Sequence, residues 1–183
     1  MTDEKQLLSE LRDGRLKEKA FGKLVAAYKQ QLYWQIRRIV LDHDDADDVL
    51  QNAFIKIWKN IDSFREESSL YTWLYRVTTN EALSFMKQKR RQLTTRIEDE
   101  RDSDYLLNSL HADPYFEGDE VQLKLQEAIA LLPEKQRLVF NMRYFENIKY
   151  DDMEQILGTS TGALKASFHH AVKKIEDYFN TTD

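Results

Sequence analysis

A group of hydroxyl, basic and imidazole side chains lies near the end of this sequence, interspersed with small alanines. Hydroxyl and ammonium groups can hydrogen-bond to phosphates and to the edges of nucleic-acid bases, and alanine can contact the thymine methyl group. The candidate nucleic-acid-binding residues are Ser160, Thr161, Ala163, Lys165, Ala166, Ser167, His169, His170 and Lys173. Because most of these side chains are short, we expect DNA shape to contribute to specificity.

No combination of residues in the sequence predicts catalysis or a bound metal. The chain has no cysteine, and it contains no nucleophile–base pair, glycine-rich phosphate loop or metal-ligand spacing. His169 and His170 are adjacent, so on a helix they point about 100° apart and do not easily share a metal. We therefore assign no catalytic residue, no metal and no cofactor, and an enzyme is the least favoured interpretation.

A second group of polar residues lies in the segment from Asp44 to Trp58. Its members are Asp45, Asp47, Asp48, Gln51 and Asn52. An acidic helix face can bind a basic partner surface, although acids in a first turn also suit the positive end of the helix dipole. Judged by these residues alone, an ordinary solvated helix face is the commoner explanation. A divalent-metal site is less favoured, because the acids point in different directions.

A basic cluster follows at Lys87, Lys89, Arg90 and Arg91, with Arg96 beyond it. Such a cluster is ordinarily a solvated helix end. It can also bind phosphates, and each phosphate neutralised would add roughly 0.7 to 0.9 to the salt dependence of nucleic-acid binding.

Helical periodicity runs through the segments that carry these groups. From Ala46 to Ile61, apolar residues recur at the i, i+3, i+4, i+7 spacing of a helix buried on one face. Similar stripes predict helices over residues 21–40, from about residue 70, over 121–132 and after Pro133. Five glycines and two prolines allow few sharp turns, which favours long helices over an all-β fold.

The last periodic segments predict a helix-turn-helix. We expect one helix over residues 150–157, a turn at Gly158, and a second helix capped by Ser160. In DNA-binding proteins the second helix of this motif lies in the major groove. The nine candidate residues named first belong to this second helix and its cap.

Acidic residues are concentrated in one segment. The net charge is -5, yet nine of the 32 acidic residues and one of the 27 basic residues lie between Ile97 and Glu120. The rest of the chain therefore has 26 basic against 23 acidic residues. We predict an all-α protein with two small helical domains, residues 1–96 and 121–183, joined by an acidic linker at 97–120. The leucines of this linker allow a short helix within it.

The sequence has no stretch with the length and apolarity of a signal peptide or a membrane span. The lack of cysteine permits a reducing compartment. We therefore expect a cytoplasmic protein that is not itself inserted in a membrane.

Three stretches resemble the sigma factors of bacterial RNA polymerase, in particular the small extracytoplasmic-function (ECF) class. They are DADDVLQNAFIKIW at residues 45–58, FREESS…TWLYRV…N between residues 64 and 80, and LPEKQRLVF at 132–140. The third leads into the helix-turn-helix, and the resemblance covers the chain from about Phe21 to Phe179. The order and spacing of the three stretches make the resemblance specific.

The resemblance implies that the two domains divide promoter binding between them. Binding to core RNA polymerase is implied for Asp45, Asp47, Asp48, Gln51 and Asn52. Binding to the -10 element of promoter DNA is implied for Arg65, Ser68, Ser69, Arg76 and Asn80, with Lys87, Arg90 and Arg91 near the opened strand. The -35 element would be read by the second helix of the helix-turn-helix, with the nine residues named first.

In the family, the segment from Phe64 to Leu70 and the position of Asn80 receive a base extruded from the -10 element. Extrusion costs a few kcal/mol of stacking, so polar groups must hydrogen-bond to the exposed edge of the base. For Asn80, a hydrogen bond between packed helices is an alternative role of nearly equal weight.

Two features of the helix-turn-helix depart from the usual pattern. Glu154 stands where alanine commonly allows close helix packing, with Met153 before it, so we expect an altered angle between the helices. Ser167 replaces an arginine found in many family members, so base assignments do not transfer.

The family also implies a membrane-linked anti-sigma factor as a partner, besides core RNA polymerase and promoter DNA. The main alternative is a helix-turn-helix transcriptional regulator that binds DNA without polymerase. That alternative explains the second domain but leaves the 45–58 segment without a role.

Overall fold

The structure is a computed structural model that describes residues 4–94, 102–113 and 118–181. Within these ranges the secondary structure is helical, with no strand, which confirms the all-α prediction. The helices are α1 (Glu4–Arg12), α2 (Lys17–Val40), α3 (His43–Asn60), η1 (Ile61–Ser63), α4 (Leu70–Thr94), α5 (Asp102–His111), α6 (Glu120–Ala130), α7 (Glu134–Tyr144), α8 (Tyr150–Leu157) and α9 (Thr161–Thr181). None of these described helices is long and apolar enough to cross a bilayer.

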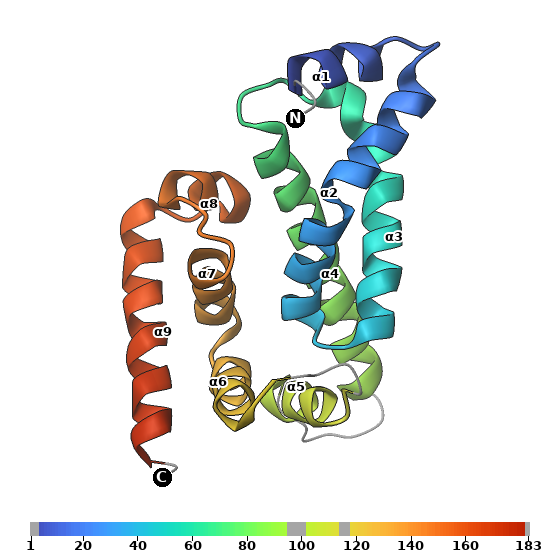
Figure 1. The fold of residues 1–183 in the computed structure, drawn as a ribbon. Coiled ribbons are helices and arrows are strands. Elements are labelled where there is room, and N and C mark those ends of the chain that lie inside the picture. The colour runs from blue at the N-terminus through green and yellow to red at the C-terminus, as the bar shows by residue number, and fades with distance from the viewer. Residues whose placement is uncertain (1–3, 95–101, 114–117, 182–183) are drawn as a thin grey trace.

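The helices form two groups that lie side by side (Figure 1). Helices α1 to α4 form the first group and α6 to α9 the second, with α5 across the end of the first, next to α6. The core of the first group contains fully buried apolar residues from α2, α3 and α4, including Leu24, Ile36, Val49, Ile57 and Leu74. Burial of each such side chain contributes about 1.5–3 kcal/mol before entropy is counted.

Helix α3 starts with a side-chain cap that the sequence analysis did not assign. The backbone N–H of Asp45 donates to the Asp42 carboxylate at 2.9 Å. A carboxylate cap satisfies a free N–H and is favoured by the helix dipole. It fixes the start of the helix that carries the acidic candidates.

Helix α1 was not predicted from the sequence. Leu7, Leu8 and Leu11 are buried in the core of the first group and attach α1 to the end of the bundle. The helix is nine residues long, so its apolar pattern is shorter than the windows in which helical periodicity is informative.

Part of the predicted linker is helical and packed. Leu106, on α5, is fully buried in the first core, and Asp113 forms an ion pair with Arg37 of α2. The acidic residues at 98–100 and 117, like the basic Arg96 and Arg101, lie outside the described residues.

The second group is built around α7. Ile129, Phe140 and Ala171 form a buried cluster that joins α6, α7 and α9. Pro133 is the N-cap of α7, as expected of a residue that ends one helix and begins another.

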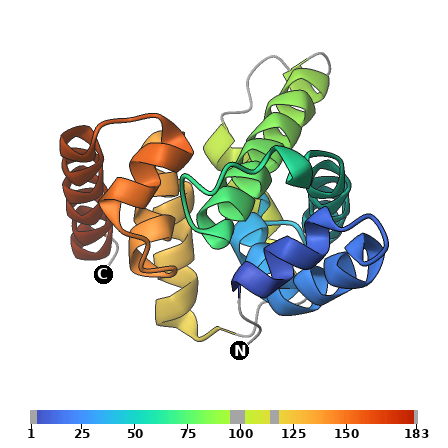
Figure 2. The ribbon, with the colours of Figure 1, turned by 90° about the horizontal axis from the view of Figure 1, so that it is seen from above.

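The two groups also share a hydrophobic cluster. Tyr75 of α4 is buried with Val139 and Met142 of α7 and with Met153 of α8. Figure 2 shows α8 and α7 lying against α4 in a second view. In the described part of the chain, the two groups are therefore packed together, with the helix-turn-helix against the first group. We call this the closed arrangement.

Candidate polymerase and promoter interfaces

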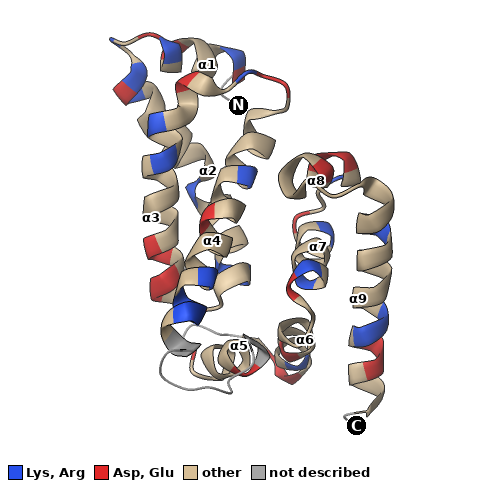
Figure 3. Ribbon diagram, turned by 180° about the vertical axis from the view of Figure 1, so that it is seen from behind, with Lys and Arg blue, Asp and Glu red and all other residues tan. Residues whose placement is uncertain are grey.

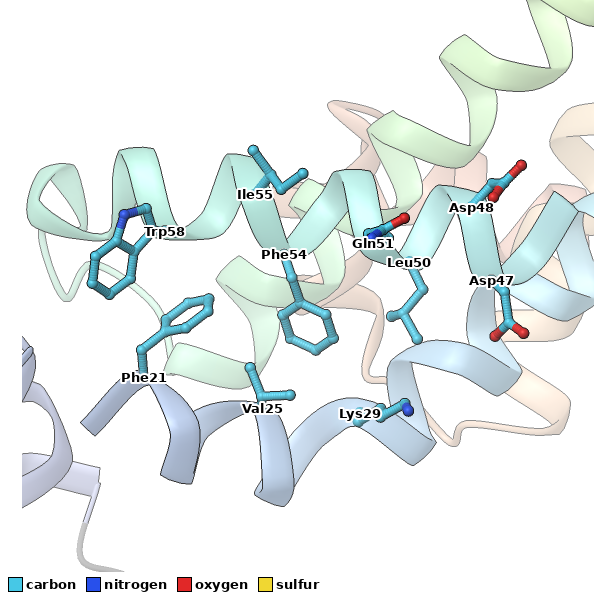
Figure 4. A pocket seen from close by; sticks show the side chains of 10 residues that line it. All are labelled: Phe21, Val25, Lys29, Asp47, Asp48, Leu50, Gln51, Phe54, Ile55 and Trp58. Atoms are coloured by element: carbon cyan, nitrogen blue, oxygen red, sulfur yellow. The ribbon is translucent and has the colours of Figure 1, made fainter. Parts of the chain in front are cut away.

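A groove of about 640 Å³ lies between α2 and α3. Val25, Leu50 and Phe54 lie along its middle, and Phe21 lies beside Trp58 (Figure 4). Trp58 lies at one end, and Asp47 lies at the other (Figure 4). The groove therefore joins an apolar floor to an acidic end.

Large apolar side chains along this groove remain open to solvent. Ile55 is 47% exposed and Trp58 is 37% exposed. The Trp58 ring packs edge-on against Phe21 at 5.0 Å between ring centroids, with the Lys17 ammonium 5.1 Å from its centroid. Rigid exposed aromatic and aliphatic groups beside charged groups are typical of a protein-binding surface.

The five polymerase-binding candidates separate into two sets. Asp47, Asp48, Gln51 and Asn52 are exposed. Asp45 is half-buried and forms an ion pair with Lys89 of α4, and it also accepts a hydrogen bond from the Tyr105 hydroxyl at 3.4 Å. The Asp45 carboxylate is thus engaged within the first group of helices.

The Lys89–Asp45 pair also affects the basic cluster. Burial alone lowers the pKa of Lys89, but hydrogen bonds with Asp45 and Tyr105 outweigh it and leave this pKa above its ordinary value. Figure 3 shows the acids of α3 and the basic end of α4 at the same end of the bundle. Lys89 is therefore a charged structural partner of α3.

A second cavity, of about 610 Å³, lies where the 64–69 loop meets α4 and α8. It is lined by Ser63, Phe64, Arg65, Glu67, Ser68, Trp73, Arg76 and Gln155. The structure thus brings together Arg65, Ser68 and Arg76, three of the -10 candidates. Gln155 comes from the first helix of the helix-turn-helix, and the sequence analysis did not select it.

Ser69 has a structural role at the same place. Its hydroxyl accepts from the Thr72 backbone N–H at 3.1 Å and hydrogen-bonds to the Thr72 hydroxyl at 2.9 Å. Ser69 therefore caps the N-terminus of α4.

The other -10 candidates extend along α4, away from this cavity. Asn80 and Lys87 are exposed, and among the described residues the Asn80 side chain has no hydrogen bond to another helix, which counts against the packing alternative. Arg90 forms an ion pair with Glu134 of α7 at 2.9 Å. Arg91 is exposed in the last turns of α4.

The predicted helix-turn-helix is formed by α8 and α9. Gly158 ends α8 in the left-handed conformation at φ 62°, and its N–H donates to the Glu154 carbonyl at 2.8 Å. Ser160 accepts from the Ala163 N–H at 3.4 Å, which confirms it as the cap of α9. These two caps fix the turn between the helices.

The nine candidates on α9 and its cap lie mostly on the solvent side of this helix. Seven are exposed and two are half-buried, these two being Thr161 and Ser167. Leu164 and Ala171 face the core. The two histidine rings are 6.0 Å apart between centroids, and the described residues contain no group of three His, Asp or Glu side chains suited to a metal.

One expectation for the packing of α8 was wrong. Glu154 is exposed, whereas Met153 is fully buried in the cluster that joins the two groups. The side chain that packs in the core is therefore Met153 and not Glu154, and the altered angle between the two helices stays a prediction.

An ion-paired arginine lies at the junction between the two groups. The Arg38 guanidinium pairs with Glu146 and lies 4.7 Å from the Phe145 ring centroid. The Asn141 side chain donates to the Arg38 carbonyl at 3.4 Å. These residues are more than 100 positions apart, and no local sequence pattern links them.

Two tyrosines of α4 lie at the same junction. Burial raises the pKa of Tyr71 to about 12, with a smaller contribution from the nearby Glu146 carboxylate. Burial likewise raises the pKa of Tyr75, which is only 2% exposed. Both phenols therefore hold their protons more tightly than an exposed tyrosine does.

Comparison with known proteins identifies both groups of helices. Residues 24–92 match the family model of Sigma-70 region 2, and residues 122–175 match that of Sigma-70, region 4. The ECF RNA polymerase sigma-E factor of Haemophilus influenzae is 31% identical over 166 residues, which cover 87% of each chain. The RNA polymerase sigma-H factor of Pseudomonas aeruginosa is 28% identical over 165 residues, 87% of this chain and 86% of its own.

Solved structures have the same fold. The sigma factor RpoE of Bartonella quintana, in a complex with the anti-sigma factor NepR, superposes with a TM-score of 0.71 at 22% identity, over 90% of this chain and 99% of its own. CnrH, in a complex with the cytosolic domain of CnrY, gives 0.70 at 19% identity, over 98% and 99%. Together with the sequence matches to both regions, this shows that the chain belongs to the ECF family of RNA polymerase sigma factors, which serve promoter-directed transcription initiation.

Proposed function

We propose that this chain binds core RNA polymerase through the α2–α3 groove and directs it to promoters by reading the -10 and -35 elements with separate domains. The observation that carries the proposal is the groove itself. Its exposed Trp58 and Ile55 adjoin the exposed acids Asp47 and Asp48. A regulator that acted through its helix-turn-helix alone would have no use for this surface.

The groove suits a partner that is basic and partly apolar. Apolar groups at its centre would supply affinity, while Asp47 and Asp48 would steer a basic surface toward it. Gln51 and Asn52 would add hydrogen bonds at the rim. Asp45 would support this surface by holding α3 to α4 through Lys89.

The -10 element would be read at the cavity beside the 64–69 loop. Arg65, Ser68 and Arg76 line this cavity and offer donors to an extruded base or its phosphates. Asn80, Lys87, Arg90 and Arg91 would follow the opened strand along α4. Ser69 would act by fixing the start of that helix.

The -35 element would be read by the exposed side of α9. The hydroxyls and alanine methyls near its N-terminus would contact base edges, and Lys165 and Lys173 would contact phosphates. The domains of the proposal are residues 1–96 for polymerase and the -10 element, 97–120 as a linker, and 121–183 for the -35 element.

The proposal includes a regulatory partner and a location. Two solved structures of similar fold are complexes with an anti-sigma factor, NepR, and with the cytosolic domain of CnrY. We propose that a membrane-linked anti-sigma factor likewise covers this chain, and that the chain acts in the cytoplasm with RNA polymerase. Catalysis would belong to the polymerase.

The proposal is tested by transcription with purified components. The chain is added to sigma-free core polymerase and a genomic promoter library, and transcript starts are mapped. We expect defined starts that depend on the chain. Absence of specific initiation would contradict the proposal, and tight promoter binding by the chain without polymerase would favour the independent regulator.

A charge-reversal variant tests the groove directly. Asp47→Lys with Asp48→Lys should weaken binding to core polymerase by about ten-fold or more, because the reversed charges would repel a basic partner surface. The matched control is Glu176→Lys with Asp177→Lys, which reverses two exposed acids late in α9. Affinities are measured without DNA, and equal affinity of both variants would remove the acids from the interface.

A further inference from the structure

The two ends of α1 contact the two ends of the 64–69 loop. At one end, the Glu4 carboxylate accepts a hydrogen bond from the Leu70 backbone N–H at 2.9 Å. At the other, the Arg12 guanidinium donates to the Phe64 carbonyl at 3.2 Å. Residues separated by more than 50 positions thus define where the loop begins and ends, and Figure 1 shows α1 beside this loop.

Arg12 also holds the middle of the loop. Its second terminal nitrogen pairs with the Glu66 carboxylate at 2.7 Å. Glu66 has a φ of 59°, a left-handed conformation that is unfavourable for a residue with a Cβ atom. Both partners are about half exposed, so the pair contributes mainly to the shape of the loop rather than to overall stability.

The position of α1 is itself fixed. Leu7, Leu8 and Leu11 are buried in the first core. Glu4 and Arg12 are eight residues apart, which is two successive steps of four residues. Residues four apart share a helix face, so both lie on one side of the helix. The Lys17–Asp62 pair, at 2.5 Å, ties the start of α2 to η1 just before the loop. These contacts give the loop a rigid support.

We propose that Glu4 and Arg12 are positioning residues that hold the 64–69 loop in the shape that receives a -10 base. This inference rests on the proposed function. Neither side chain lines the cavity, which is formed by Arg65, Ser68 and Arg76 among others. Glu4 and Arg12 act through the loop backbone, since the carbonyl of Phe64 and the N–H of Leu70 flank the loop residues that line the cavity, which are Arg65, Glu67 and Ser68.

The physical reason is pre-organisation. A loop that already has its bound shape loses less conformational freedom when a base enters. It also discriminates better between bases, because its hydrogen-bonding groups are at fixed distances from the base edge. Loss of either anchor should reduce the discrimination between bases more than the binding of polymerase.

The experiment compares Glu4→Ala and Arg12→Ala in the full-length chain with wild type. Holoenzyme is assembled on the promoter mapped above, with 2-aminopurine in the -10 element to report opening and with each -10 base substituted in turn. We expect discrimination against substituted bases to fall about ten-fold in both variants, while affinity for core polymerase stays within about two-fold of wild type. In the free protein, the Leu70 amide should exchange about ten-fold faster in Glu4→Ala.

Three further variants separate positioning from general stability. Glu4→Gln keeps an oxygen acceptor for the Leu70 N–H and should restore discrimination. Arg12→Lys keeps the charge but cannot make both contacts, so this variant should restore base discrimination only in part. Ser9→Ala, on the exposed side of α1, should behave as wild type.

Two results would overturn the inference. One is unchanged base discrimination and unchanged Leu70 exchange in both alanine variants. The other is an equal loss of opening for native and substituted bases together with weaker polymerase binding, which indicates general destabilisation. If wild type itself fails to initiate, the proposed function fails, and amide exchange still decides whether α1 holds the loop.

Discussion

Asp45 and Asp47 lie two residues apart on α3, yet their surroundings differ. Asp45 is paired with Lys89, whereas Asp47 is exposed at the end of the groove. The difference follows from helical geometry, because a step of two residues turns a side chain by about 200°. Acids that look equivalent in the sequence therefore serve a packing contact and a candidate binding surface.

At the residue scale, Tyr71 makes stability sensitive to alkaline pH. An unfolded tyrosine has a pKa near 10, and the pKa of Tyr71 is raised to about 12. Below pH 10 both states keep the proton and stability is unaffected. Between 10 and 12 the unfolded state loses its proton first, so stability should fall as the pH rises.

The loss is at most about 1.4 kcal/mol per pH unit for a fully buried phenol, and smaller for Tyr71 because solvent screens a partly exposed group. Urea unfolding across this pH range provides the measurement. Tyr71→Phe should flatten the decline, and an equally steep decline in that variant would assign it to other groups.

At the element scale, α8 and α9 depend on the geometry of one residue between them. Gly158 adopts a φ of 62°, and a Cβ atom added there would meet no other atom within 4 Å. A substitution at this position would therefore cost backbone strain rather than a collision. Gly22 lies within α2, and a Cβ atom there would also meet nothing within 4 Å.

Because the backbone conformations of these two glycines differ, we expect substitution by alanine to change stability in opposite directions. Gly158→Ala should destabilise the protein by about 1–2 kcal/mol, because alanine is strained in the left-handed region. Gly22→Ala should stabilise it by about 0.5–1 kcal/mol, because glycine is unfavourable inside a helix. Chemical unfolding followed by circular dichroism measures both, and changes of the same sign would contradict the backbone explanation.

At the scale of the whole molecule, the two groups of helices are held closed across α4. Tyr75 is buried between them, and Arg38 pairs with Glu146 across the junction. In this arrangement α8 contributes Gln155 to the cavity beside the 64–69 loop. The closed form therefore brings the helix-turn-helix against the same cavity that the proposed function assigns to the -10 element.

Breaking the Arg38–Glu146 pair should open the molecule. Glu146→Lys would place two positive charges together and remove a contact of about 2 kcal/mol, so small-angle scattering should show a larger radius of gyration. The charge swap, Arg38→Glu with Glu146→Arg, should restore the compact form. Lys149→Glu, an exposed change at the start of α8, is the control, and an unchanged radius in Glu146→Lys would show that the pair does not maintain closure.

Much of the fold follows from local patterns. The helical stripe from Ala46 to Ile61, the turn at Gly158 and the Ser160 cap each depend on neighbouring residues, and each was predicted. Helix α1 was missed because its pattern is short. The assignment of Glu154 to a packing position failed because a motif gives the order of residues and not which side of a short helix is buried.

The sequence by itself determined the all-α class, the helix-turn-helix and the resemblance to ECF sigma factors, since periodicity, caps and motif spacing are properties of nearby residues. The tertiary structure alone decided which acids remain exposed, how α1 supports the 64–69 loop, and that α8 contributes Gln155 to the cavity beside it. Contacts such as Glu4 to Leu70 and Arg38 to Glu146 join residues 66 and 108 positions apart. Their energies depend on how whole helices pack, and a single sequence carries no local signal for that.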